Sequence, residues 1–175
     1  MMQRLFPVFL PVALLCAGLA GPLQAAPSGE KSDETGAVSE GLMTRTKPLL
    51  YALTLIGRPY KRGGTDPDKG MDCSGFVRHV YNDASGLELP HNALQMSHEG
   101  DAVEKTALEP GDLVFFNTRR KPFSHVGIYL GEGRFVHSSS TRSKHVTVSN
   151  LADRYWTTRY NGARRISPER LKPSF

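Results

Sequence analysis

The chain has 175 residues, of which 39% are hydrophobic and 22% charged, and its formal net charge is +5. This length suits one compact domain with a core. The basic residues are scattered, and no basic helix, zinc-finger spacing or aromatic-glycine RNA motif accompanies them, which argues against a nucleic-acid-binding protein.

The first 25 residues have the pattern of a secretory signal peptide. Arg4 supplies a positive start, Leu5–Leu19 is apolar, and Leu23–Ala26 offers a small-residue cleavage site, used after Ala25 in our prediction. The apolar stretch is short for a membrane-spanning helix. We therefore predict an exported protein, periplasmic or extracellular.

The chain has two cysteines, and the leader contains one of them. Removal of residues 1–25 takes Cys16 away and leaves Cys73 alone, so that an internal disulfide is excluded and Cys73 is either inert and buried or reactive. Ala13–Cys16 also weakly resembles a bacterial lipoprotein signal, although Leu15 stands where a small residue is usual. Membrane association, at the outer membrane, is expected only if Cys16 is lipidated.

Residues 26–41 are polar and rich in Ser, Gly, Glu and Thr, which predicts a flexible linker before a domain at 42–175. Apolar spacing from Leu42 to Ile56 predicts a helix that ends before Gly57, with Pro48 at its start or at a kink. A glycine-rich loop is then expected over Gly57–Gly70.

A second helix is expected directly after Met71-Asp72. Apolar residues recur at helical spacing beyond Cys73, namely Phe76, Val77, Val80, Tyr81 and Ala84. Cys73 therefore lies at or near a helix N-terminus, where the helix dipole favours a thiolate over a thiol.

The rest of the chain is dominated by strand patterns. A short helix is expected over residues 92–100, and strands over Leu113–Phe116, His125–Leu130, Arg134–His137, Val146–Val148 and Tyr160–Ile166. The second and third of these strands form a hairpin around residues 131–133. Helices that precede strands predict an α+β domain with an antiparallel sheet.

Cys73, His125 and His137 together suggest a cysteine nucleophile with a histidine base. His125 opens a strand and His137 ends the next one, so that His137 could orient His125. The backbone N–H of Cys73 and the Tyr60 hydroxyl are candidate donors to an oxyanion. Taken singly, the cysteine could be a buried apolar residue, and the histidines sheet-end residues or metal ligands. No CxxC or HExxH spacing supports a metal site, and none is predicted.

Five ordered segments resemble the motifs of the NlpC/P60 cell-wall cysteine peptidases, a family of the papain-like superfamily. The resemblance runs from about Leu49 to Ile166, and the matching segments are Gly57–Gly64, Asp72–Val77, Leu108–Phe116, Ser124–Gly131 and Phe135–Ser139. It implies a papain-like NlpC/P60 fold, with N-terminal helices packed on a curved antiparallel sheet.

The resemblance implies that Cys73 is the nucleophile, His125 the base and His137 the orienting third member, with Tyr60 beside the oxyanion. Asp72 and Ser74 would line the cleft, and either could also cap the helix. The implied function is a murein endopeptidase, which cleaves stem peptides or peptide cross-links of peptidoglycan through a thioester. A monomer without metal or organic cofactor is expected.

Two departures from the family pattern leave the substrate preference open. His91-Asn92 stands where Arg and Ser or Thr are common, and Lys61-Arg62 stands where an apolar or aromatic residue is usual. Cleavage of a D,D cross-link and cleavage between D-glutamate and diaminopimelate both fit the sequence. An acyltransferase or amidase on another exported amide or ester, and a non-catalytic wall-binding module, are the alternative functions.

Overall fold

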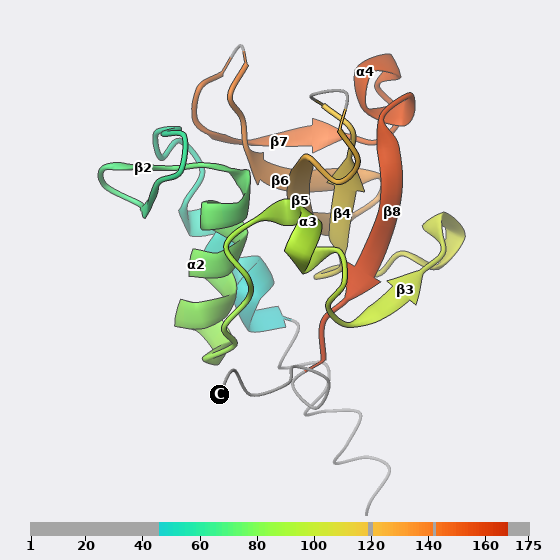
Figure 1. Cartoon of the computed structure of the whole chain (residues 1–175), viewed down its shortest axis with the longest axis horizontal. Coiled ribbons are helices and arrows are strands. Elements are labelled where there is room, and N and C mark those ends of the chain that lie inside the picture. Colours follow the sequence, from blue (N-terminus) through green and yellow to red (C-terminus); the bar gives the residue numbers. More distant parts are fainter. Residues whose placement is uncertain (1–45, 119–120, 142, 168–175) are drawn as a thin grey trace, which may run out of the picture. The chain divides into compact units, whose positions relative to one another are not determined.

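The computed structural model describes residues 46–118, 121–141 and 143–167 (Figure 1). The signal peptide and the linker predicted from the sequence, together with Cys16, lie outside these residues and stay predictions. Within the described ranges, no helix combines the length and the hydropathy that crossing a bilayer requires.

Two helices precede the sheet, as the sequence predicts. Residues 46–54 are helical, Pro48 included, and a turn follows at 55–57. Helix α2 spans Cys73–Ser85. It ends at Gly86, whose left-handed backbone (φ 66°) lets its N–H reach the carbonyls of the last turn.

Helix α2 exists because one of its faces is apolar and its first turn is capped. Phe76, Val77, Val80 and Tyr81 are all buried, and the Asp72 side chain accepts a hydrogen bond from the Gly75 N–H. The apolar face packs on the sheet, mainly against its central strands. The predicted amphipathic helix is therefore confirmed, with Cys73 as its first residue.

A six-stranded antiparallel sheet forms the other half of the domain (Figure 1). Its strand order is β3-β8-β4-β5-β6-β7, with β3 Asp101–Val103, β4 Leu113–Phe116, β5 His125–Gly131, β6 Arg134–Ser138, β7 Val146–Asn150 and β8 Tyr160–Arg165. In Figure 1, β6 and β7 run across the direction of β4 and β8, so the sheet is strongly twisted. The predicted α+β class and antiparallel sheet are confirmed.

Several short elements differ from the sequence prediction. The loop before α2 contains a small hairpin, β1 Thr65–Asp66 and β2 Gly70–Met71, closed where Asp66 Oδ1 accepts the N–H groups of Asp68 and Lys69. The helix expected over 92–100 is the shorter α3, Ala93–Met96. The 3₁₀ turn η1 (Lys105–Ala107), strand β3 and helix α4 (Arg154–Thr157) have no counterpart in the prediction, because elements of three or four residues are too short to show periodicity.

The central strands β4 and β5 are buried on both faces of the sheet. Alternation along β4 divides its side chains between two apolar clusters: Leu113 and Phe115 face the helices, and Val114 and Phe116 face α4. The second cluster also contains Phe135 and Trp156. The sheet is thus the middle layer of the domain, with different packing partners on its two sides.

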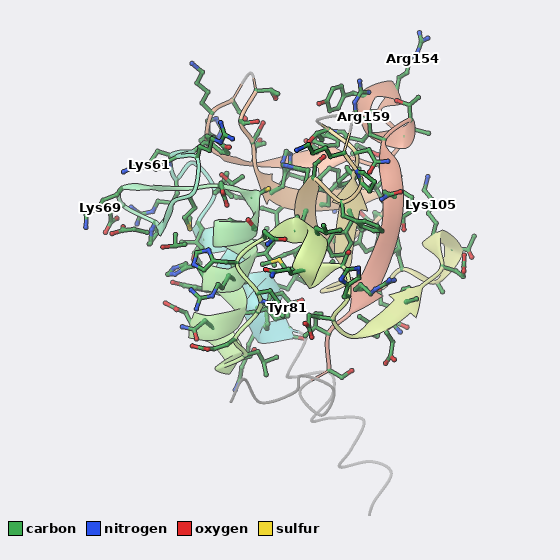
Figure 2. All side chains as sticks on the ribbon, viewed as in Figure 1. Lys61, Lys69, Tyr81, Lys105, Arg154 and Arg159 are labelled. Carbon is green, nitrogen blue, oxygen red and sulfur yellow. The ribbon has the colours of Figure 1, made fainter. Side chains whose placement is uncertain are left out.

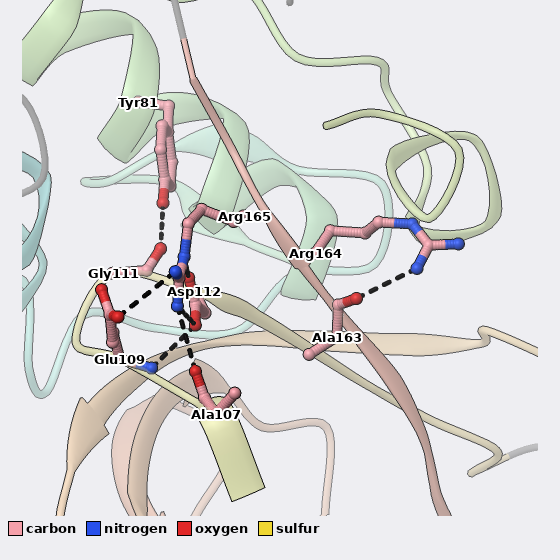
Figure 3. A network of polar contacts seen from close by, with 8 residues as sticks. All are labelled: Tyr81, Ala107, Glu109, Gly111, Asp112, Ala163, Arg164 and Arg165. Carbon is pink, nitrogen blue, oxygen red and sulfur yellow. Dashed lines mark hydrogen bonds and ion pairs between the residues drawn. The ribbon is translucent and has the colours of Figure 1, made fainter. Parts of the chain in front are cut away.

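A buried ion pair ties the turn before β4 to β8 (Figure 3). Asp112 is fully buried, and its two carboxylate oxygens accept hydrogen bonds from Nε and Nη2 of Arg165, each at 2.9 Å. In the same turn, Tyr81 of α2 donates its hydroxyl hydrogen to the carbonyl of Gly111. This network therefore links helix α2 to two strands of the sheet.

Basic side chains are spread around the molecule rather than gathered on one face. Figure 2 labels five of them, and they lie in three regions: the loop before α2 (Lys61 and Lys69), the turn η1 (Lys105), and α4 with the residues that follow it (Arg154 and Arg159). This distribution agrees with the scattered Lys and Arg of the sequence.

Candidate active site

Cys73 lies at the first helical position of α2 and is half-buried. The first turn of α2 contains no acidic residue after the N-cap Asp72, and the positive end of a helix dipole favours a thiolate over a thiol. Sequence reasoning placed the sulfur correctly at the helix N-terminus.

Asp72 holds the glycine-rich loop against the start of α2. Its Oδ1 accepts from the Gly75 N–H at 2.8 Å and from the Ser74 hydroxyl at 3.0 Å, and its Oδ2 accepts from the Gly63 N–H at 2.9 Å. The Asp72 N–H in turn donates to the carbonyl of Gly64. The capping role that the sequence allowed for Asp72 is therefore present.

The loop and the helix approach so closely that a side chain would not fit between them. A Cβ on Gly75 would collide with the carbonyl oxygen of Gly64. Gly75 thus lets the loop that carries Tyr60 pass directly over the first turn of α2.

A cleft of about 720 Å³ opens beside Cys73. Four residues predicted for the site line it together: Tyr60, Asp72, Cys73 and Ser74. The opposite wall comes from α3 and from the loop before β5, with the lining residues Asn92, Ala93, Leu94, Lys121, Pro122, Phe123 and Ser124. The two departures from the family pattern were the pairs His91-Asn92 and Lys61-Arg62, and one residue of each pair, Asn92 and Arg62, lines this cleft.

His125 and His137 face one another across neighbouring strands. His125 opens β5 and His137 lies near the end of β6, and their ring nitrogens Nε2 and Nδ1 are 2.9 Å apart. Gly127 lies beside the pair, where an added Cβ would crowd the Phe135 ring and the Cβ of His137. The predicted contact between the two histidines is therefore made, and Gly127 leaves room for the backbone and side chain of His137 on the neighbouring strand.

His137 is deeply buried and uses both ring nitrogens. Its exposed fraction is 1%, and its Nε2 lies 2.9 Å from the Ser149 hydroxyl oxygen on β7. Burial, and secondarily the nearby His125, lower the pKa of His137 well below its usual value. This ring is accordingly neutral at physiological pH.

Trp156 of α4 packs over both histidines. Its ring stacks on His125 with a centroid distance of 5.5 Å and an interplanar angle of 26°, and it meets His137 edge-on at 4.9 Å. Phe116 and Phe135 also pack against the indole, at centroid distances of 4.8 and 5.1 Å. The aromatic wall fixes the orientation of both imidazoles.

Sequence reasoning missed Ser149 and Trp156. A weak signal existed for each: Ser149 continues the alternation of the predicted strand at 146–148, and Trp156 is the single tryptophan of the chain. Neither signal says which residues lie beside the histidines, because that depends on the pairing of β7 with β6 and on the packing of α4 against the sheet.

The described residues contain no group of three or more His, Cys, Asp and Glu side chains that could hold a metal ion. Chemically, the site offers a thiol at a helix N-terminus and a phenol that line one cleft. The hydrogen-bonded imidazole pair starts at His125, next to the cleft-lining Ser124, and its second ring, His137, lines a separate cavity. These are the parts of an acyl-transfer centre based on a cysteine nucleophile.

The chain is similar to known proteins. Residues 57–165 match the NlpC/P60 family. The chain is 41% identical over 121 residues to murein DD-endopeptidase MepH of Escherichia coli K12, which covers 67% of this chain and 44% of that protein. It is 45% identical over 112 residues to gamma-DL-glutamyl hydrolase of Bacillus subtilis 168, which covers 63% of this chain and 27% of that protein.

Among solved structures, an NlpC/P60 family protein of Bacillus cereus superposes with a TM-score of 0.64 at 32% identity. That match covers 71% of this chain and 40% of the other. The chain thus spans less than half the length of these two curated relatives. The segment that matches the family, residues 57–165, contains Cys73, His125 and His137.

Proposed function

The chain belongs to the NlpC/P60 family, and from this premise we propose that it is a cysteine peptidase that hydrolyses amide bonds in the peptides of peptidoglycan. The observation that carries the proposal is the His125–His137 hydrogen bond of 2.9 Å on the sheet that packs against the helix of Cys73. Further support comes from the relatives, one named a murein endopeptidase and the other a glutamyl hydrolase.

In the proposed mechanism, His125 takes the thiol proton of Cys73, and the sulfur attacks the carbonyl carbon of the substrate amide. A C–S bond forms, and the developing oxyanion accepts hydrogen bonds from the Cys73 N–H and the Tyr60 hydroxyl. The C–N bond then breaks as His125 gives its proton to the departing amine. His125 next takes a proton from water, whose oxygen displaces the sulfur from the thioester and releases the acid.

Within this mechanism the first-turn residues have separate roles. Both Asp72 oxygens already accept hydrogen bonds from the loop and the helix, so Asp72 positions the Cys73 backbone. Ser74 is buried and donates to Asp72, which supports the same function. His137 accepts a hydrogen bond from His125 and orients it towards the thiol.

The cleft itself favours an acidic peptide. Arg62 and Lys121 are exposed side chains that line it. Peptidoglycan stem peptides carry free carboxylates, which such cations attract. The two named relatives point to different bonds, a D,D cross-link in one and a glutamyl bond in the other.

We also propose that the enzyme acts outside the cytoplasmic membrane, in the periplasm or the extracellular space, because its substrate is there and residues 1–25 resemble a signal peptide. Action as a monomer, and attachment to a membrane only through a lipidated Cys16, belong to the same proposal.

The proposal is tested by mass spectrometry of purified muropeptides incubated with the wild-type protein and with Cys73→Ala. Conversion of cross-linked dimers to monomers by the wild type alone would support cleavage of the cross-link. Shortened stems would support cleavage within a stem. Binding without any cleavage would overturn the hydrolase function in favour of a wall-binding module, and an acylated acceptor would favour a transferase.

A further inference from the structure

Ser149 reaches the catalytic pair from a third strand. Strands β6 and β7 pair antiparallel, with His137 opposite Thr147 and Phe135 opposite Ser149. Ser149 therefore lies diagonally across from His137 on the same face of the sheet, within reach of a long side chain. The observed separation of its hydroxyl oxygen from His137 Nε2 is 2.9 Å.

The hydrogen bonds of the two rings leave one productive arrangement of protons. A neutral imidazole has one N–H and one acceptor nitrogen. For His125 to hold the thiol proton at Nδ1 it must also carry a hydrogen at Nε2, and that hydrogen is donated to His137 Nδ1. His137 must then carry its own hydrogen at Nε2, and Ser149 must accept it.

The opposite tautomer of His137 would block the reaction. With its hydrogen at Nδ1, His137 would donate to His125 Nε2, and His125 would then carry its hydrogen at Nδ1. That nitrogen would no longer be able to accept a proton from Cys73. The choice of tautomer at His137 therefore decides whether His125 acts as a base.

We propose that Ser149 is a positioning residue that holds His137 in the productive tautomer by accepting its Nε2 hydrogen. The inference rests on the proposed function, because it assigns His125 as the base for Cys73. Ser149 would be a fourth residue of the site, after Cys73, His125 and His137. None of the sequence motifs that contain those three residues predicts it.

The surroundings of Ser149 allow it to act as the acceptor. A cavity of about 520 Å³, lined by His137, Thr147, Ser149, Asp153, Tyr155 and Trp156, opens on this side of the pair. The hydroxyl hydrogen of Ser149 can be donated into this cavity. Asp153 also lines the cavity, and although it is the N-cap of α4, its side chain makes no capping hydrogen bond.

The test compares Ser149→Ala, Ser149→Thr and the matched control Thr147→Ala. Thr147 lies on the same strand and in the same cavity, but His125 and Ser149 already engage both ring nitrogens of His137. Alkylation of Cys73 by iodoacetamide is measured from pH 5 to 9, since only the thiolate reacts. The melting temperature of each variant is recorded to confirm folding.

For Ser149→Ala we expect alkylation near neutral pH to slow about tenfold, the effect of one lost hydrogen bond to a buried ring, with the profile moved to higher pH. On muropeptides, kcat should fall by a similar factor with KM unchanged, and the pH range of activity should narrow from both sides. Ser149→Thr should restore wild-type values within about twofold, and Thr147→Ala should match the wild type.

Two outcomes would overturn the proposal: an alkylation profile for Ser149→Ala that coincides with the wild type, or a Thr147→Ala variant that shifts as much as Ser149→Ala. Because alkylation needs no substrate, it separates this proposal from the proposed function. A wild type that cleaves no muropeptide, but whose thiol reactivity depends on Ser149, would refute the substrate and leave the role of Ser149 standing.

Discussion

The two sides of the candidate active site are stabilised in different ways. On the side of the nucleophile, backbone packs on backbone: Gly75 lies under Gly64, and one carboxylate, Asp72, ties the loop to the helix. On the side of the base, rings pack on rings, with Trp156 over His125 and His137. The nucleophile side is built from residues 60–75, whereas the base side draws on residues from 116 to 156.

This difference predicts which kind of substitution should destabilise each side. A backbone contact is broken by adding atoms, because the loop and helix α2 cannot move apart without moving Tyr60. An aromatic cluster is broken by removing atoms, because the cavity left behind loosens both imidazoles. Four substitutions or conditions test this contrast.

The largest loss of stability is expected on the base side, from Trp156→Ala. Trp156 is 9% exposed and contacts five rings, that of Tyr155 included, so its removal should lower the free energy of unfolding by about 4 kcal/mol. Urea unfolding measures this. The neighbouring Tyr155 is 41% exposed, and Tyr155→Ala is the control, expected to cost about 1 kcal/mol or less. Equal losses for the two variants would contradict the assignment of Trp156 to the base side.

The Asp112–Arg165 ion pair, which links the turn before β4 to β8, should contribute nearly as much to stability as Trp156. Arg165→Met leaves the Asp112 carboxylate buried without its cation, and should cost about 3 kcal/mol in chemical unfolding. Arg134→Met removes a pair with Glu132 of similar length, 2.8 Å, but both partners are exposed. We expect less than about 0.5 kcal/mol there. A small effect at Arg165 would mean that the turn before β4 does not depend on this pair.

On the nucleophile side, Gly75→Ala should destabilise the protein although alanine is the better helix former. Contact with the Gly64 carbonyl should outweigh the propensity gain of about 1 kcal/mol, for a net loss of about 2 kcal/mol. Peptidase activity should fall with it, because the loop that carries Tyr60 has to move. Ser85→Ala on the same helix removes a buried hydroxyl without a partner and should be neutral or stabilising. A stabilised Gly75→Ala variant would refute the close packing.

The smallest effect is a pH dependence on the base side. The folded state lowers the pKa of His137 below its ordinary value of 6.5, so the unfolded chain takes up a proton first as the pH falls. Stability is therefore lost below pH 6.5, with a slope that approaches about 1.4 kcal/mol per pH unit. His137→Gln should remove this slope in unfolding measured between pH 7.5 and 5, and the exposed His98→Gln should keep it. An unchanged slope in His137→Gln would show that other groups cause it.

The same contrast explains what could be predicted from the sequence. The nucleophile side lies within one short stretch, so local patterns locate the loop, the capping aspartate and the first helical residue. The long strands were predicted from their apolar runs, and the hairpin of β5 and β6 brought His125 and His137 together as expected. Ser149 and Trp156 were missed because their place beside the histidines depends on β7 pairing with β6 and on a single turn of helix.

The stacking of Trp156 on His125 has an optical consequence. The chain contains one tryptophan, so its indole emission comes from a single place, directly against the proposed base. An imidazolium against an indole face interacts with the ring electrons in a way that a neutral imidazole does not. The native protein thus has a built-in fluorophore in contact with the proposed base, and its emission can be recorded without any label.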